Sequence, residues 1–322
     1  DTNILNAEIL LNLDSEELGT LYIGCSGGKN TLAKFSFKNE AVPTDSVAYE
    51  IKIEGLVGGH SGLEIHQQRG NAIKILARVL RQSELDFQLR LSEIQGGNKH
   101  NAIPREAFSQ VTLPKSFEKD FLAFIEKMNA IVRDEIASIE NGLKISAIKN
   151  DLPANVMEMK VQTNLLLALN ALPHGVMKMS PDIPNLVETS TNLAIIKTEN
   201  STVSIVTSQR SSVASEIKEA VDTIGAIFLL AQAEVNKTDG YPGWKPNIHS
   251  PILSVFKNTY KNLYGHEPEV KAIHAGLECG IIGEKYPKMD MISFGPTMFG
   301  VHSPDEKLLI PTIEPFYNLL KS

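Results

Sequence analysis

The sequence has little cysteine and lacks several motifs that would assign a class at once. Two cysteines stand among 322 residues, with no CxxC pair, so a disulfide framework is not expected. No apolar run reaches the length of a membrane span. Neither a GxGxxG nor a Walker phosphate loop is present, and no signal-peptide pattern opens the sequence. These features predict a cytosolic protein with no membrane partner.

The sequence also lacks clusters of basic residues. Its formal net charge is −7, and lysine and arginine are scattered along the chain. This distribution argues against nucleic acid or an anionic membrane as a partner. Apolar content of 42% and charged content of 21% are typical of globular proteins. The length suits one large domain or two ordinary ones.

The compact metal motifs HExxH, HxxEH and a close His-x-Asp are missing as well. Two candidate ligands remain: Asp14, which follows the apolar run 9–13, and His302, which lies in a loop after another apolar run. A carboxylate and an imidazole at strand ends suit Zn²⁺, Mn²⁺ or Co²⁺, but a catalytic zinc takes three protein ligands and a water. Spacing alone therefore favours simple turn residues at both positions.

Hydrophobic periodicity gives a coarse map of the elements. Alternation predicts strands at 9–13, 21–25, 47–56, 85–94, 107–113, 191–197, 202–207, 270–273 and 290–294, with a hairpin turn at 200–201. Helical spacing predicts helices at 117–139, 161–172, 215–231, 251–264, near 277 and at 315–320, and another that carries Ile73, Leu76, Ala77 and Leu80 on one face. The Ser61-x-x-Glu64 spacing predicts a capping box that opens this last helix.

Changes in pattern predict the domain organisation. Ser26-Gly27-Gly28 ends the first apolar runs, and from residue 240 onward strands and helices alternate. We therefore predict a discontinuous α/β domain formed by residues 1–28 and 237–322. Residues 29–236 are predicted to form an inserted α+β domain of two related halves.

Four polar residues are candidates for a site, each with a simpler alternative. His60, among glycines before a helix, suits hydrogen-bond donation to a developing oxyanion, or is a solvated turn histidine. Arg210, at the end of the strand 202–207 and before a helix, suits a substrate carboxylate, or is an ordinary exposed arginine. Asn101 offers an amide to a substrate, or is a turn residue. Glu278 suits a substrate amine, or is a carboxylate at a helix N-terminus.

Several longer stretches, in order along essentially the whole chain, carry a family resemblance. They are 11–17 with 22–25, 58–62, 70–72, 101–107, 240–244, 274–280, and 295–296 with 302–306. In these stretches the sequence resembles the M20 family of metallopeptidases, and within it the cytosolic dipeptidases that act on Xaa-His dipeptides. The resemblance implies an α/β catalytic domain with an inserted lid domain, and hydrolysis by a water that two divalent metal ions activate.

The resemblance also implies roles for individual residues. Asp14 matches a ligand of one metal ion and His302 a ligand of the other, with zinc expected first and manganese or cobalt as alternatives. His60 matches the lid histidine that polarises the scissile carbonyl. The dipeptide is then held by a set of substrate-binding residues: Arg210, Asn101, Glu278 and His274.

One departure from the family pattern matters. The family's His-x-Asp ligand pair, its metal-bridging Asp and its Glu-Glu pair, which includes the general base, have no counterpart here. We therefore expect a fragment that has an incomplete metal site and no activity alone. The alternative is a non-catalytic module, derived from an M20 peptidase, that binds peptides or dimerises. A homodimer is left open, as is whether His60 acts within its own subunit.

Overall fold

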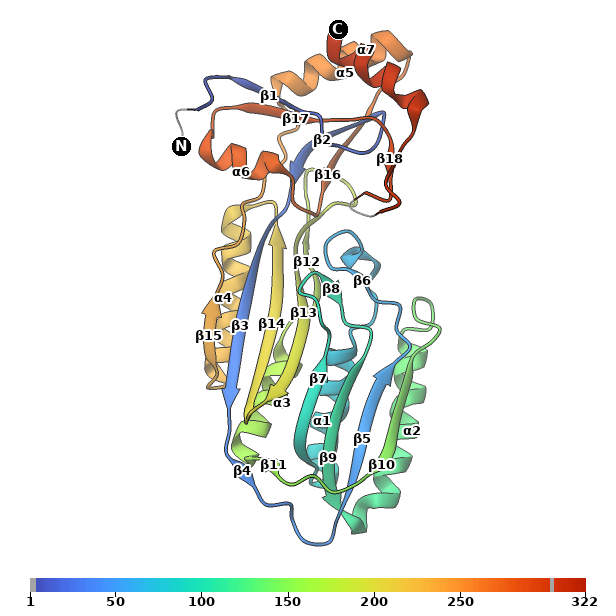
Figure 1. Ribbon diagram of the computed structural model, residues 1–322, viewed down its shortest axis with the longest axis vertical. Helices are drawn as coiled ribbons and strands as arrows, with labels where there is room; N and C mark the ends of the chain where they lie inside the picture. The colour runs from blue at the N-terminus through green and yellow to red at the C-terminus, as the bar shows by residue number, and fades with distance from the viewer. Residues whose placement is uncertain (1–3, 302–303) are drawn as a thin grey trace.

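The computed structural model describes residues 4–301 and 304–322, and all elements below belong to these residues. The molecule is elongated, with a small region at one end and a large region that makes up the rest (Figure 1). The small region comprises the described residues of 4–25 and 241–322, and the large region residues 27–237. No helix within these described ranges has both the length and the apolar character needed to cross a membrane.

The small region is built on a four-stranded sheet of order β1-β17-β2-β16. β1 (Ile9–Asn12) runs parallel to β17 (Asp290–Ser293), and β2 (Thr20–Cys25) runs parallel to β16 (Glu269–Ile273). The two pairs meet in antiparallel sense, so β1 and β17 end at one edge and β2 and β16 at the opposite edge. The remaining elements are α5 (Pro251–Tyr264), α6 (Glu278–Lys285), α7 (Ile313–Lys321), η3 (Ile310–Thr312) and the hairpin β18 (Met298–Phe299)–β19 (Lys307–Leu308).

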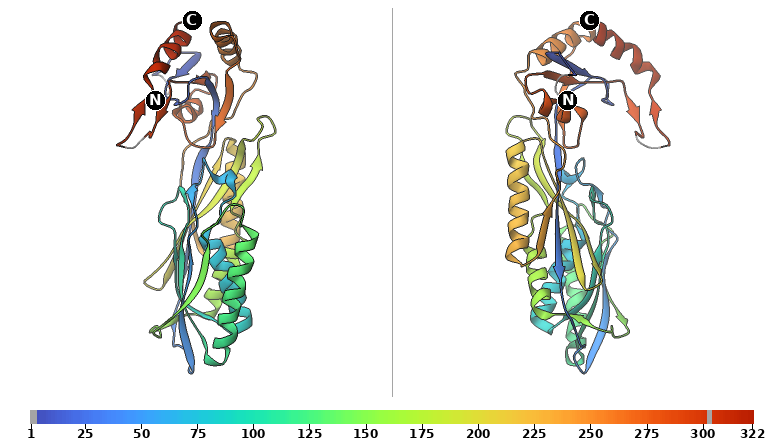
Figure 2. Two further views of the ribbon diagram at one scale, coloured as in Figure 1. Left: turned by 90° about the vertical axis from the view of Figure 1, so that its right-hand side faces the viewer. Right: turned by 60° about the vertical axis from the view of Figure 1, so that its left-hand side comes forward.

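The large region is built on a nine-stranded sheet of order β10-β5-β9-β7-β13-β14-β3-β15, with β12 paired to β13. Its helices lie against one face of the sheet (Figure 2). The strands are β3 (Gly27–Ser36), β5 (Ser46–Glu54), β7 (Arg90–Gly96), β9 (Ala107–Pro114), β10 (Lys144–Asn150), β12 (Gly175–Met179), β13 (Val187–Glu199), β14 (Thr202–Ser211) and β15 (Glu234–Lys237). The helices are α1 (Ala72–Phe87), α2 (Glu118–Glu135), α3 (Met159–Ala171), α4 (Ala214–Leu230), η1 (Ile65–Gln67) and η2 (Lys115–Phe117). Two short strand pairs lie outside the main sheet: β4 (Asn39–Glu40) with β11 (Val156–Met157), and β6 (Gly59–His60) with β8 (Ala102–Ile103).

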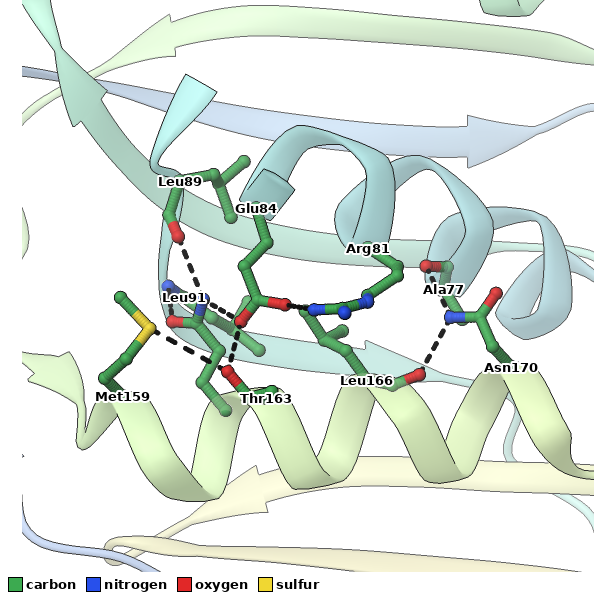
Figure 3. A network of polar contacts seen from close by, with 10 residues as sticks. Ala77, Arg81, Glu84, Leu89, Leu91, Met159, Thr163, Leu166 and Asn170 are labelled. Carbon is green, nitrogen blue, oxygen red and sulfur yellow. Dashed lines mark hydrogen bonds and ion pairs between the residues drawn. The ribbon is translucent and has the colours of Figure 1, made fainter. Parts of the chain in front are cut away.

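The large region consists of two halves that share one sheet. β7 of the first half pairs with β13 of the second, and α1 packs against α3 (Figure 1). A polar network joins these two helices: Glu84 accepts hydrogen bonds from Gln162 Nε2 at 3.0 Å and Thr163 Oγ1 at 2.8 Å, and pairs with Arg81 (Figure 3). Because Glu84 is buried, these donors are needed to offset its desolvation. The junction between the halves is thus specified by polar contacts as well as by packing.

The core of the large region follows the predicted helical stripe. Ile73, Leu76 and Leu80 on α1 have exposures of 0% and pack between the sheet and the neighbouring helices. The hairpin turn at Asn200 and Ser201 is confirmed, with φ values of 47° and 58° that fit a tight two-residue connection.

Two sequence predictions near α1 were wrong. The helix begins at Ala72, where the Asn71 side chain accepts hydrogen bonds from the amides of Ile73 and Lys74, and no helix follows Ser61 directly. The predicted strand 85–94 is in its first part the end of α1. A left-handed residue, Gln88, ends that helix before β7 starts. Periodicity alone could not separate the end of a buried helix from the start of a strand.

The two regions are joined by two paired chain segments. Cys25 and Trp244 exchange backbone hydrogen bonds at 2.9 Å, and Gly28 and Tyr241 do so at 3.0 and 2.9 Å. A Cβ atom on Gly27 would lie 2.6 Å from the amide nitrogen of Gly243, so a side chain here would keep the strands apart. The connection is therefore a short antiparallel ribbon rather than a loose linker.

Candidate functional site

His60 is held by its local backbone in one protonation form. Its Nδ1 atom accepts hydrogen bonds from the amides of Gly62 at 3.2 Å and Leu63 at 3.0 Å. Nδ1 therefore carries no proton, and the neutral ring carries its proton on Nε2. Burial, and then the positive charge of Arg210, lower the pKa of His60 from its usual 6.5. His60 is accordingly a neutral side chain with an N–H to donate.

The loop around His60 is fixed by an acidic and a basic side chain. Glu64 accepts a hydrogen bond from the His60 amide at 2.8 Å and pairs with Arg69 at 2.8 Å. Arg69 in turn donates to the carbonyl of Gly58. Glu64 thus closes the loop on itself instead of capping a helix from Ser61, as the predicted capping box would require.

Asn101 lies beside this loop through its backbone. Its carbonyl accepts a hydrogen bond from the Ser61 amide at 2.9 Å, and the neighbouring Ala102 pairs with His60 between β8 and β6. Asn192 on β13 donates to the Ala102 carbonyl at 2.8 Å and so ties this pair to the large sheet. A role for the Asn101 side chain stays a prediction.

Arg210 lies within β14 and is buried, with 7% of its surface exposed. Its predicted place at the end of a strand and before a helix is confirmed, although the strand extends to Ser211 rather than to residue 207. Its Nη1 donates to the Tyr241 hydroxyl at 2.9 Å, and Nε has no partner among the described residues. Arg210 also forms no ion pair with a described carboxylate. A buried guanidinium of this kind retains N–H groups for an anionic ligand.

His274 reaches the same place from the small region. It follows β16, has 6% of its surface exposed, and its Nε2 lies 2.7 Å from the Ser190 hydroxyl on β13. Burial, and then the charge of Arg210, lower the pKa of His274 to about 3, although the backbone of Val187 acts in the opposite direction. The ring is therefore neutral.

These side chains form one group, which we call the junction cluster: His60, Ser190, Arg210, Tyr241 and His274. Ser190 and Arg210 are opposite each other in the β13–β14 pairing, and the charge of Arg210 acts on both histidines. A Cβ atom at Gly62 would lie 2.4 Å from the carbonyl oxygen of His274, so the His60 loop contacts the small region directly. Residues far apart in the sequence thus provide neutral donors around a buried cation.

Asp14 and Glu278 form a second, exposed group at the ends of β1 and α6. Asn12 connects them: the Asp14 amide donates to Asn12 Oδ1 at 3.1 Å, and Asn12 Nδ2 lies 3.4 Å from Glu278 Oε2. His302 lies outside the described residues. Within those residues no group of three or more histidine, cysteine, aspartate or glutamate side chains is arranged to hold a metal ion. The described side chains alone therefore do not form a site for two metal ions.

A cavity of about 710 Å³ lies beside the paired connecting segments. Its lining includes Tyr241, Trp244, Lys29 and Asp290, but not His60, Arg210 or His274. It therefore shares Tyr241 with the junction cluster but none of the cluster's other members. The candidate site is identified by the chemistry of its side chains rather than by the size of a cavity.

Two members of the junction cluster were not singled out from the sequence. Tyr241 stands in the stretch 240–244 that contributed to the family resemblance, but nothing in that stretch indicated its partner. Ser190 belongs to a run of strand residues with no motif. Only the pairing of β13 with β14 brings it beside Arg210 and under His274.

Comparison with known proteins adds independent information. Residues 51–140 match the family model M20_dimer, described as the peptidase dimerisation domain. The chain is 37% identical over 320 residues to the cytosol non-specific dipeptidase of Escherichia coli (strain K12), covering 99% of this chain and 66% of that protein. The crystal structure of aminoacylhistidine dipeptidase from Vibrio alginolyticus matches with a TM-score of 0.95 and 39% identity, covering 99% of this chain and 65% of that one. The chain thus spans slightly less than two thirds of the length of either relative.

Proposed function

Because the chain belongs to the M20 peptidase family, we propose that it is the substrate-holding part of a metal-dependent dipeptidase. The observation that carries this proposal is the state of His60. Two backbone amides occupy its Nδ1, so that Nε2–H is the group free to donate. A fixed neutral donor next to a buried cation is what hydrolysis of a short peptide with a free carboxylate requires.

We propose the following roles. His60 donates its Nε2–H to the oxyanion that develops from the scissile carbonyl, and its lowered pKa keeps the ring neutral near pH 7. Arg210 binds the C-terminal carboxylate of the dipeptide, which its burial and unpaired Nε support. Glu278 takes the substrate amine, and Asn101 and His274 complete the binding site.

Divalent metal dependence is part of the proposal through the family. We propose Asp14 and His302 as ligands, one for each of two metal ions, with zinc first and manganese or cobalt as alternatives. Such ions would supply the activated water. The exposed position of Asp14 at the end of β1 leaves its carboxylate accessible for coordination. Asp14→Asn should lower the metal content of the purified protein, whereas His60→Ala should not.

We further propose the domain division predicted above, with residues 29–236 as the lid and residues 1–28 and 237–322 as part of the catalytic domain. The word cytosol in the name of the curated relative supports a cytoplasmic location. The match of residues 51–140 to a dimerisation domain supports a homodimer. Light scattering on the purified protein determines its mass in solution.

The test uses the full-length protein that carries this sequence, stripped with chelator and reloaded with Zn²⁺, Mn²⁺ or Co²⁺ in turn. Its substrates are Xaa-His dipeptides, dipeptides without histidine, a tripeptide and a C-terminally amidated dipeptide. We expect metal-dependent hydrolysis of free dipeptides, with the tripeptide and the amide poorly cleaved. Equal cleavage of the free acid and the amide would show that the protein does not recognise the C-terminal carboxylate of the substrate.

A second candidate function is a non-catalytic module that binds peptides or dimerises. The dimerisation-domain match and the lack of a three-ligand group among the described residues favour it. The same experiment separates the two candidates. Saturable dipeptide binding by calorimetry without turnover under any metal condition supports the module, and turnover that follows the protein peak supports the peptidase.

A further inference from the structure

Tyr241 is the described side chain that contacts the Arg210 guanidinium. We propose that Tyr241 is a positioning residue, which orients Arg210 for a carboxylate ligand and couples this orientation to the packing of the two regions. The proposal rests on the proposed function in one respect, since it takes Arg210 as the group that binds the substrate carboxylate.

The contacts of Arg210 leave it dependent on Tyr241. Arg210 is buried, and among the described residues its guanidinium donates a hydrogen bond from Nη1 to the Tyr241 hydroxyl at 2.9 Å. Two histidines whose pKa values the charge of Arg210 lowers, His60 and His274, are neutral near pH 7 and so supply no counter-charge. An arginine side chain has many rotamers, and no counter-ion among the described residues favours one of them for Arg210. One hydrogen bond of fixed geometry therefore decides where its free N–H groups point.

Tyr241 is 37% exposed, yet it contacts both regions. Its backbone pairs with Gly28, whose Cβ atom, if present, would lie 2.6 Å from the Tyr241 ring. A Cβ atom on Gly276 would lie 2.9 Å from the other side of the ring. Gly28 is the second residue of the long strand β3 of the large region, whereas Gly276 lies in the loop after β16 of the small region. The ring is thus packed between two glycines, one from each region.

This arrangement has a consequence for ligand binding. With Nη1 held by the Tyr241 oxygen, the guanidinium plane is set before a ligand arrives, and the buried Nε–H has no partner among the described residues. Preorganisation of this kind improves binding by reducing the entropy lost when the ligand is bound. Loss of the tyrosine hydroxyl should then weaken binding of the free carboxylate, while the reaction at the scissile bond is unaffected.

The test compares Tyr241→Phe with wild type in the full-length protein. We expect KM for a free dipeptide to rise roughly tenfold, the size of effect of losing a hydrogen bond to a charged group. We expect kcat to stay within about twofold, because the lost contact is shared by ground and transition states. The preference for the free acid over the amide should shrink by the same factor as the KM effect.

The matched control is Tyr264→Phe. The Tyr264 hydroxyl also forms a hydrogen bond, which it donates to the carbonyl of Pro315 at 2.6 Å within the small region. It should leave the preference for acid over amide unchanged. If Tyr241→Phe leaves that preference at the wild-type value, or lowers kcat as much as it raises KM, the proposal is wrong.

A second measurement decides even if no dipeptide is hydrolysed, which would reject the proposed function. The Arg210 Nε–H signal in a ¹H–¹⁵N spectrum is assigned by its loss in Arg210→Lys. In wild type we expect slow exchange with water, and in Tyr241→Phe exchange faster by roughly tenfold. Unchanged exchange in Tyr241→Phe would overturn the positioning role whatever the activity.

Discussion

The large and small regions of this protein differ in the size of the apolar core that each encloses. In the large region, helices and a long sheet enclose one extensive cluster that includes Ile51, Leu80 and Phe121, all with 0% of their surface exposed. In the small region the main cluster is much smaller, and Ile310, 75% exposed, and Phe299, 56% exposed, lie outside it. Burial of apolar surface is the main source of folding free energy. The large region should therefore be the more stable part.

The same contrast holds for the polar side chains of the candidate site. The large region contributes His60, Ser190 and Arg210, each fixed by hydrogen bonds or strand pairing, whereas Asp14 and Glu278 of the small region are exposed. His274 is the exception, because it belongs to the small region but is buried against β13 of the large region. The difference indicates that substrate-orienting groups are prepared by the fold of the large region. The exposed carboxylates are instead free to rearrange around a ligand.

The largest expected effect tests the difference in burial. Leu80→Ala, in the core of the large region, should lower the free energy of unfolding by about 2–5 kcal/mol. Ile310→Ala, in the small region, should change it by no more than about 0.5 kcal/mol. Urea unfolding of both variants gives the two values. Similar losses in the two variants would remove the contrast between the regions.

The next prediction concerns His60. In the full-length protein, His60→Ala should lower kcat by roughly 10²–10³-fold, the usual effect of removing one oxyanion donor. Metal content should not change, because the proposed ligands are other residues. Metal analysis of the purified variant is therefore measured beside its kinetics. Loss of metal on this substitution would indicate that His60 is a metal ligand. The roles assigned to the two regions would then not be separate.

Arg210→Lys should have a smaller effect that falls on binding. A lysine keeps the charge but not the planar fork, so KM for a free dipeptide should rise by about one to two decades. The C-terminally amidated dipeptide is the control, and its KM should change little. If the variant discriminates acid from amide as well as wild type, Arg210 is not the carboxylate clamp.

The smallest expected effect concerns pH and stability. The pKa of His274 is lowered to about 3 in the folded protein, against about 6.5 when unfolded. Between these values the unfolded chain binds a proton that the folded one does not, so stability falls as pH falls, by at most about 1.4 kcal/mol per pH unit. His274→Gln should reduce this slope between pH 6 and 4. Trp244, the single tryptophan, reports unfolding at the connection between the regions.

His174 offers a matched comparison within the large region, because burial lowers its pKa to about 4. His174→Gln should reduce the slope over the same range, since it removes a similar buried neutral ring. If the slope is the same in wild type and both variants, neither histidine is held neutral by the fold.

The elements that sequence patterns predicted well are those whose signal is local. The apolar stripe of α1 and the hairpin at Asn200–Ser201 both depend on residues within a few positions of each other. By contrast β3, which begins Gly27-Gly28-Lys29, was missed because its stability comes from pairing with β14 and β15, distant in sequence. Local propensity is a weak guide where non-local pairing decides.

The candidate site divides in the same way. The family stretches include the positions of His60 and His274, and strand-end placement indicated Arg210, but the partners of these residues could not be predicted. Ser190 and His274 are 84 positions apart, and Arg210 and Tyr241 are 31 apart. Glu64 shows the converse: its spacing from Ser61 fits a capping box, yet its carboxylate binds the His60 amide and Arg69. The three-dimensional structure determines which of its possible partners the Glu64 carboxylate binds, and sequence spacing does not contain that information.

The protonation state of His60 is the most direct test of the claim that the large region prepares the oxyanion donor. A long-range ¹H–¹⁵N spectrum at pH 7, with His60 assigned by its loss in His60→Gln, reports which ring nitrogen carries the proton. The account predicts a neutral ring with the proton on Nε2, because Gly62 and Leu63 donate to Nδ1. A proton on Nδ1, or a charged ring at that pH, would contradict it.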